Sequence, residues 1–224
     1  MNKIRFIFVA GIISASFFSC APQLQITSKQ IHLDSDLAAD RELSNFISSY
    51  SKEMDTQMNV KIAESKNDFI VARPSSNLMN WMADAVFSNQ TRNKILSQPT
   101  FCLLNTGGIR SSIGKGDVKL KDIYKIMPFD NSIVWVKLPL VTLDEISKYL
   151  NKSGGEPISN IQMRSGELML NGDLETDFFW VITSDYLYSG GDHMEFFKES
   201  IEVIETKTLI SDALVEEAKL QKVL

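Results

Sequence analysis

The sequence is poor in the residues that hold catalytic metal ions, with two histidines and two cysteines among 224 residues. A dinuclear hydrolytic site needs carboxylates and imidazoles clustered around ions about 3.5–4 Å apart. His32 and His193 stand in no HxH, HExxH or DxH pattern. A GxSxG elbow and a P-loop are also missing. We therefore expect no metal cofactor and no complete catalytic centre in this chain.

The sequence also lacks an excess of positive charge, since its formal net charge is −5 and its pI is about 5.2. Binding of nucleic acid polymers usually requires a basic field, so such a polymer is not an expected partner. A small anion is still compatible with this charge, because one or two well-placed arginines can hold a phosphate. If Cys20 is modified, Cys102 has no partner for an intramolecular disulfide.

Long hydrophobic runs are missing except near the N-terminus, where Lys3 and Arg5 precede an apolar run from Phe6 to Phe18. This pattern is typical of an export signal and is too short for a stable membrane span. Ser19 and Cys20 follow it, which indicates lipoprotein processing with Cys20 as the lipidated N-terminus. Ordinary signal-peptide cleavage is the alternative. We predict an exported, membrane-anchored lipoprotein facing the periplasm or the cell surface.

After this signal, residues 1–20, we expect a tether over 21–33 and one domain over 34–224. Apolar spacings of three and four predict helices, and short apolar or β-branched runs predict strands. Four helices are expected. Three run from Asp34 to Met58, from Thr142 to Leu150 and from Ser211 to Leu220. The fourth is capped by Ser75 or Ser76 and continues to Val86. The expected strands are Phe69 to Ala72, Phe101 to Leu104, Ser132 to Leu138, Glu167 to Leu170, Phe178 to Thr183 and Ile201 to Glu205.

These elements interleave without regular βαβ repetition, which predicts an α+β fold with a mixed sheet and packed helices. Thr142 is expected to open its helix with a capping box, and Ser153-Gly154-Gly155 to end it. Asn171-Gly172 is an expected tight turn.

Polar clusters follow apolar segments at three points, where binding residues often lie on a rigid scaffold. They are Asn105 to Arg110, Met127 to Asn131, and Asp185 to Asp192. Glycines in the first and third clusters let the backbone approach a ligand. Together the clusters offer two aromatic faces and hydrogen-bonding groups, as a nucleoside site requires.

Each cluster taken alone has a structural interpretation as well. Asn105 to Arg110 could be a tight turn that ends in a surface arginine. Phe129 alone would more often be a core residue, because most phenylalanines in a chain of this size are buried. Asp192 could cap the helix that begins after it.

The sequence resembles the C-terminal domain of 5′-nucleotidases over roughly Asp34 to Leu224. Four motifs occur in that family's order and spacing: Asn77 to Ala85, Asn105 to Arg110, Pro128 to Asn131, and Tyr186 to Asp192. The family domain is of the α+β type. The chain departs from the family at Met79 and Thr106, where glycine is usual, and at Tyr186, where many members have phenylalanine.

The resemblance implies that Phe129 and Tyr186 sandwich a base, and that Asn105 contacts the base or its sugar. It implies that Asp192 and Arg110 address ribose hydroxyls and phosphate. Asn131 matches a further binding position. Arg73 is a candidate phosphate contact, although it lies one position away from the family's arginine.

The family's metallophosphoesterase domain, which supplies the metals and the catalytic histidine, has no counterpart in this sequence. The resemblance therefore implies the nucleotide-recognition half of a 5′-nucleotidase, inactive alone, whose partner is a separate metallophosphoesterase chain that holds divalent metal ions. The alternatives are a stand-alone nucleotide- or nucleoside-binding lipoprotein and a surface interaction module with a vestigial pocket.

Overall fold

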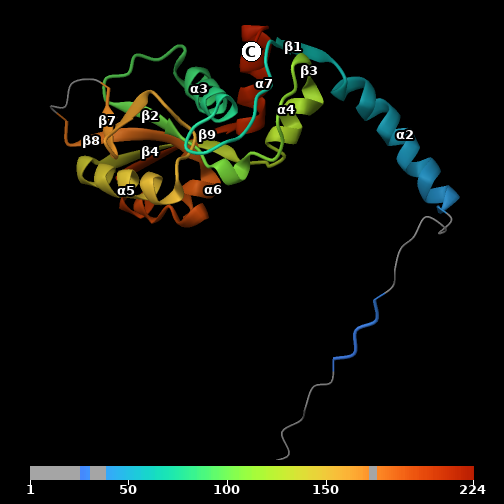
Figure 1. The fold of residues 1–224 in the computed structure, drawn as a ribbon, viewed down its shortest axis with the longest axis horizontal. Helices are drawn as coiled ribbons and strands as arrows, with labels where there is room; N and C mark the ends of the chain where they lie inside the picture. The colour runs from blue at the N-terminus through green and yellow to red at the C-terminus, as the bar shows by residue number, and fades with distance from the viewer. Residues whose placement is uncertain (1–25, 31–38, 172–175) are drawn as a thin grey trace, which may run out of the picture. The chain divides into compact units, whose positions relative to one another are not determined.

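The computed structural model describes residues 26–30, 39–171 and 176–224. Within them a five-stranded sheet has the order β5-β2-β8-β4-β9 (Figure 1). β2 and β8 are parallel and the other neighbours are antiparallel, so the sheet is mixed. Its strands are β2 (Thr100–Leu103), β4 (Ser132–Pro139), β5 (Ile158–Ser159), β8 (Phe178–Ser184) and β9 (Glu202–Leu209). The predicted α+β fold with a mixed sheet is confirmed.

Helices cover both faces of this sheet, as Figure 1 shows for α3 and α5 on opposite sides. One core lies between the sheet and α3, α4 and α7, and the other lies between the sheet and α5 and α6. These helices are α3 (Asn77–Thr91), α4 (Leu120–Ile126), α5 (Leu143–Ser153), α6 (Asp185–Tyr188) and α7 (Ile210–Gln221).

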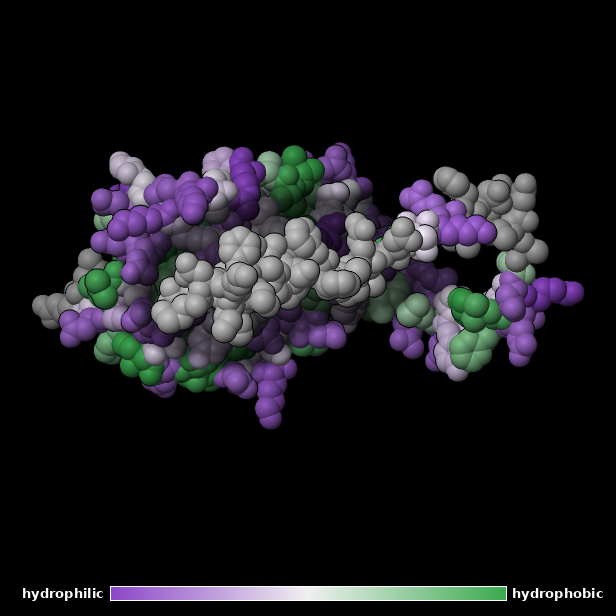
Figure 2. Space-filling model, turned by 90° about the horizontal axis from the view of Figure 1, so that it is seen from below, coloured by the Kyte–Doolittle hydropathy of each residue, from purple (hydrophilic) through white to green (hydrophobic). Residues whose placement is uncertain are grey.

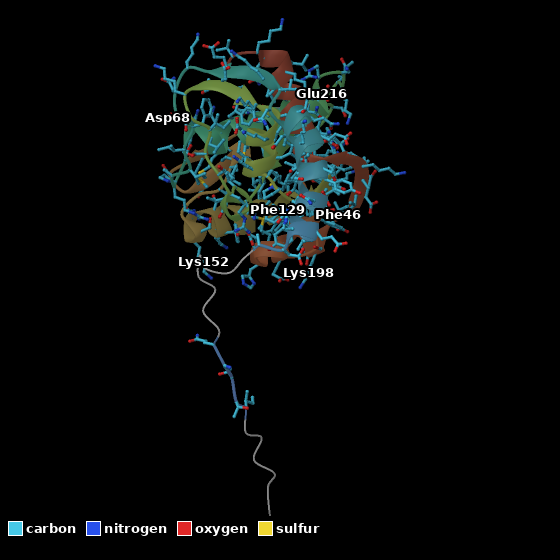
Figure 3. The ribbon with its side chains drawn as sticks, turned by 90° about the vertical axis from the view of Figure 1, so that its right-hand side faces the viewer. Phe46, Asp68, Phe129, Lys152, Lys198 and Glu216 are labelled. Atoms are coloured by element: carbon cyan, nitrogen blue, oxygen red, sulfur yellow. The ribbon has the colours of Figure 1, made fainter. Side chains whose placement is uncertain are left out.

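The interior strand β4, which lies between β8 and β9, shows why its sequence forms a buried strand. Successive side chains of a strand point to opposite faces, so alternate residues belong to different cores. Ile133 and Trp135 join the core under α3 and α7, whereas Val134 and Val136 join the core under α5. By contrast, charged side chains such as those of Lys152 project outward (Figure 3).

Two two-stranded antiparallel sheets lie outside the main sheet among the described residues. β1 (Lys61–Ser65) pairs with β3 (Gly116–Lys119), and β6 (Ile161–Arg164) pairs with β7 (Glu167–Leu170). The predicted strand Glu167 to Leu170 is thus confirmed. β1, β3 and α4 were not expected, because these segments are short and carry several charged residues that hide an apolar period.

Two local expectations are wrong. Phe69 forms only an isolated bridge with Ile113, and no strand covers Phe69 to Ala72, since the Ile70 N–H donates to Asn77 Oδ1 instead of to a neighbouring strand. Thr142 does not cap α5, because it has helical dihedrals and its hydroxyl donates to the Pro139 carbonyl at 2.8 Å.

The predicted N-terminal cap of α3 and the predicted end of α5 are confirmed. The Ser76 hydroxyl caps α3 by accepting from the Met79 N–H at 3.4 Å. Gly154 ends α5 in a left-handed conformation, with φ of 81°, which glycine adopts without strain. Gly172 and the tight turn expected there lie outside the described residues.

Helix α2 (Arg41–Met58) runs across the division of the chain into two units, Met1–Asn45 and Phe46–Leu224. The predicted amphipathic helix is confirmed over Arg41–Met58. Ala39 and Asp40, which were expected to be part of it, are not helical, and Asp34 to Ala38 lie outside the described residues. The helix buries no residue, and apolar side chains are visible on its surface (Figure 2). Among the described helices, none has the length and apolar character to cross a membrane.

Candidate functional site

The three polar clusters meet at one edge of the main sheet. β2 and β8 are parallel, so the segments that follow them leave from the same edge. β4 is antiparallel to β8 and pairs Ile133 with Ser184, so the segment before β4 arrives at that edge too. Asn105 follows β2, Phe129 precedes β4, and Tyr186 follows β8.

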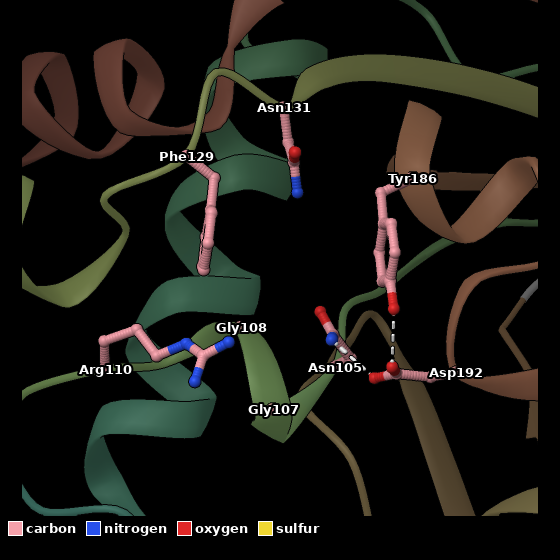
Figure 4. A pocket seen from close by; sticks show the side chains of 8 residues that line it. All are labelled: Asn105, Gly107, Gly108, Arg110, Phe129, Asn131, Tyr186 and Asp192. Carbon is pink, nitrogen blue, oxygen red and sulfur yellow. Dashed lines mark hydrogen bonds between the residues drawn. The ribbon is translucent and has the colours of Figure 1, made fainter. Parts of the chain in front are cut away.

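These segments enclose a pocket of about 380 Å³ (Figure 4). Its size is typical of a small-molecule site. All six predicted binding residues line it, together with two glycines; the lining is Asn105, Gly107, Gly108, Arg110, Phe129, Asn131, Tyr186 and Asp192. The structure thus brings these residues together, although their binding roles stay predictions.

The two aromatic rings form the walls of the pocket. In Figure 4 the rings of Phe129 and Tyr186 face each other across an open gap. Phe129 also packs against the core beneath α3 and α7 and is half-buried. Tyr186 is 43% exposed. One face of each ring is therefore free for a planar ligand such as a base.

The Asp192 carboxylate is held from two sides at the opposite end of the gap from Asn131. Asn105 Nδ2 donates to Asp192 Oδ2 at 2.6 Å, and the Tyr186 hydroxyl donates to Oδ1 at 2.9 Å. The Tyr186 pKa is raised by the hydrogen bond to this carboxylate and by its charge. Asp192 makes these contacts instead of capping a helix. It is a fixed acceptor that can receive hydroxyl donors from a ligand.

Gly108 is required by the packing of Asn105. A Cβ at position 108 would lie 2.8 Å from Asn105 Oδ1, closer than side chains tolerate. Asn105 is buried, with 8% exposure, so its amide has little room to move aside. The glycine turn therefore positions the amide that holds Asp192.

Arg110 places its guanidinium 5.1 Å from the centre of the Phe129 ring. This cation–π contact leaves donors of the planar group directed at the pocket. The Arg110 N–H donates to the Ile126 carbonyl at 2.8 Å, which fixes the backbone. Asn131 is fixed likewise, because its carbonyl accepts from the Ile210 N–H at 2.9 Å. Arg110 can pair with a phosphate and Asn131 can hydrogen-bond a base or sugar.

Arg73, the candidate phosphate contact, does not line this pocket. Its NH2 group donates to Glu156 Oε1 at 2.9 Å in an ion pair. The Glu156 side chain is only 3% exposed, and its other oxygen accepts from the Thr106 N–H at 2.6 Å. Glu156 thereby ties Arg73 to the glycine turn. A phosphate-binding role of Arg73 stays a prediction.

Glu156 and Tyr149 hold residues of the site in place, but the sequence analysis did not predict this role for either. Glu156 follows a Gly-Gly pair, the same signal that marked the first and third clusters. The Tyr149 hydroxyl donates to the Asp192 carbonyl at 3.0 Å. Burial, with the nearby carboxylates of Glu156 and Asp192, raises the pKa of Tyr149 to about 12. No pattern within helix α5 distinguishes this tyrosine from an ordinary half-buried one.

Within the described residues, no group of three or more histidine, cysteine, aspartate or glutamate side chains could hold a metal ion. Cys102 is buried in β2, and burial raises the pKa of its thiol. Such a thiol is a poor nucleophile at neutral pH. Cys20 and His32 lie outside the described residues.

The chain thus forms an α+β domain with a pocket of small-molecule size at one edge of its main sheet. Residues 61–146 match the model of the 5′-nucleotidase C-terminal domain. The chain is similar to a 5′-nucleotidase of Vibrio parahaemolyticus, with 25% identity over 160 residues, which are 68% of this chain and 27% of that protein. The chain thus spans about a quarter of that curated relative.

Solved structures share the fold. The 5′-nucleotidase precursor of Thermus thermophilus matches with a TM-score of 0.63 and 24% identity, over 81% of this chain and 40% of that one. The NAD nucleotidase of Haemophilus influenzae matches with a TM-score of 0.59 and 15% identity, over 82% of this chain and 39% of that one.

Proposed function

We propose that this protein recognises a nucleotide or nucleoside in the pocket between Phe129 and Tyr186. The observation that carries the proposal is the pair of facing rings that form the walls of a pocket also lined by an arginine and an oriented carboxylate. The rings suit a base, the Asp192 carboxylate suits ribose hydroxyls, and Arg110 suits a phosphate. The match of residues 61–146 to the 5′-nucleotidase C-terminal domain supports a nucleotide-binding role.

Calorimetry of the full chain, purified in detergent, tests this proposal. Nucleosides, their 5′-monophosphates, ribose 5-phosphate and inorganic phosphate are titrated in parallel. The proposal expects saturable binding of compounds that carry a base, and weaker binding of ribose 5-phosphate, which cannot stack. Equal binding of ribose 5-phosphate and nucleotide would contradict a base-stacking site.

We further propose that hydrolysis takes place with a separate metallophosphoesterase chain. The Vibrio parahaemolyticus relative is a much longer protein named a 5′-nucleotidase, and this chain spans about a quarter of its length. The two histidines of the chain are not paired in a metal-binding pattern. Divalent metal ions in the partner would activate water, while this chain would hold base and sugar so that the phosphate meets the metals.

Phosphate release from nucleotides by the full chain, with added divalent metal and with or without a candidate metallophosphoesterase, tests the partner proposal. Release is expected only with both chains together. Robust release by the wild-type chain alone that is lost in Phe129→Ala would contradict the proposal. Binding of nucleotide without release alongside any phosphoesterase of the same organism would favour a stand-alone binding lipoprotein.

We also propose that the protein is exported and anchored by a lipid on Cys20. The charged and apolar pattern before Cys20 supports this location. Metabolic labelling with a fatty acid is expected to mark the wild-type protein and not Cys20→Ala. Absence of label on the wild type would contradict lipidation and leave ordinary export.

A further inference from the structure

The hydroxyl of Tyr186 is a group that a phenylalanine at this position would lack. It donates to Asp192 Oδ1 at 2.9 Å, while the aromatic face of the same residue borders the pocket. One side chain thus contributes to two different parts of the site. Stacking on a base needs only the ring, so stacking does not explain the presence of the hydroxyl group.

The backbone around Asp192 is shaped to allow this hydrogen bond. Asp192 has φ of 51°, in the left-handed region that aspartate tolerates better than most residues. A Cβ at Gly191 would lie 2.5 Å from the Tyr186 ring, so glycine permits the close approach. The Tyr149 hydroxyl holds the Asp192 carbonyl from another side. The carboxylate is therefore fixed through both its backbone and its side chain.

The bonding capacity of Asp192 indicates which ligand group it can receive. Each carboxylate oxygen has two lone pairs, and the protein uses one on each, through Asn105 and Tyr186. One acceptor position is left on each oxygen. Two neighbouring hydroxyl groups, as in the cis-diol of ribose, can donate to the two oxygens together. A sugar without these hydroxyls cannot.

We propose that the Tyr186 hydroxyl is a specificity-determining group, which orients the Asp192 carboxylate for the vicinal diol of a ribonucleoside or ribonucleotide. This inference rests on the proposed nucleotide-binding function and adds the sugar preference. Tyr186→Phe keeps the stacking face but leaves Asp192 Oδ1 without its protein donor. The variant therefore loses affinity for ribose compounds while it keeps affinity for sugars that lack the diol.

The test compares a ribonucleoside monophosphate with its 2′,3′-dideoxy analogue by calorimetry on the full chain. Wild type should prefer the ribose compound. Tyr186→Phe should bind that compound about three- to tenfold more weakly and the dideoxy analogue within about twofold of wild type. Tyr124→Phe is the matched control, because it removes a hydroxyl that lies 3.5 Å from Asp212 and not in the pocket, and it should keep the wild-type ratio.

An alkaline titration followed by tyrosine absorbance gives a second measurement. It reports the ionisation of the Tyr186 phenol, which would not change if this hydroxyl had only a structural role. The difference between wild type and Tyr186→Phe isolates one phenol, whose pKa is raised through Asp192. In Asp192→Asn the same phenol should ionise at lower pH. Loss of sugar preference in Tyr186→Phe together with this shift would support the proposal.

An unchanged ratio in Tyr186→Phe, or tighter ribose binding because the hydroxyl had competed with the ligand, would overturn it. Equal binding of both compounds by wild type would overturn the sugar preference and leave the nucleotide site standing. Binding of neither compound would overturn the proposed function as well.

Discussion

Two arginines beside the glycine turn have opposite environments. Arg110 lines the pocket and stacks over Phe129, and no ion pair to it is found among the described residues. Arg73 is paired with Glu156, a buried carboxylate that also holds the Thr106 N–H. The first arginine presents its charge to a ligand, and the second uses it within the protein. Both are arginines near a binding motif, so only their partners distinguish them.

The largest expected effect comes from breaking the ion pair between Arg73 and Glu156. Glu156→Ala removes the acceptor of the Thr106 N–H and the counter-ion of Arg73. Because Arg73 is 40% exposed and can turn to water, the loss should be about 2 kcal/mol in the free energy of unfolding, which is less than the usual cost of breaking a fully buried pair. Urea unfolding measures it.

Glu205→Ala, which truncates an exposed glutamate, is the control and should change stability by less than about 0.5 kcal/mol. Glu156→Gln, which keeps an acceptor for Thr106, should fall between the two. Equal stability of Glu156→Ala and wild type would show that this carboxylate does not hold the turn.

The next effect concerns the wall on which Arg110 stacks. Phe129→Ala removes one aromatic face and should weaken nucleotide binding roughly tenfold to a hundredfold, since base stacking contributes about 1–3 kcal/mol. Phe129→Tyr, which keeps the face, should bind within about threefold of wild type. Calorimetry together with thermal unfolding separates a lost wall from a lost core contact. Unchanged affinity with a large fall in Tm would make Phe129 a core residue only.

The two arginines are compared directly by alanine substitution. Arg110→Ala should weaken binding of a nucleoside monophosphate about tenfold and of its nucleoside much less, because a charge-assisted contact to the phosphate is lost. Arg73→Ala should leave the nucleotide-to-nucleoside ratio unchanged. Calorimetric titration with both ligands measures the ratio. If Arg73→Ala lowers it as much as Arg110→Ala does, Arg73 leaves Glu156 when ligand binds and contacts the phosphate.

The smallest effect concerns Tyr149, whose pKa is raised to about 12. A tyrosine in the unfolded chain ionises near pH 10. Its contribution to stability is therefore fully present below about pH 10 and is lost as pH rises through about 12. Tyr149→Phe should flatten the fall in stability between these values, measured by urea unfolding at several pH values. If the free energy of unfolding falls equally in both proteins between pH 10 and about 12, other groups cause the fall.

The sequence predicted the residues that line the pocket better than it predicted the side-chain contacts around the pocket. Asn105, Phe129 and Tyr186 were expected in one pocket from motif order, and the strands that carry them have clear apolar patterns. The pairing of Arg73 with Glu156, 83 positions away, has no trace in either local pattern. Thr142 matched a capping box and yet donates to Pro139, because a short turn precedes the helix. Local spacing predicts elements, but side-chain partners depend on how those elements pack.

A crystal structure of the full chain grown with a saturating nucleoside monophosphate is the decisive test of nucleotide binding in this pocket. We expect the base between the rings of Phe129 and Tyr186, the ribose at Asp192 and the phosphate on the side of Arg110. A nucleotide bound elsewhere, or no nucleotide in this pocket at saturating concentration, would contradict this expectation.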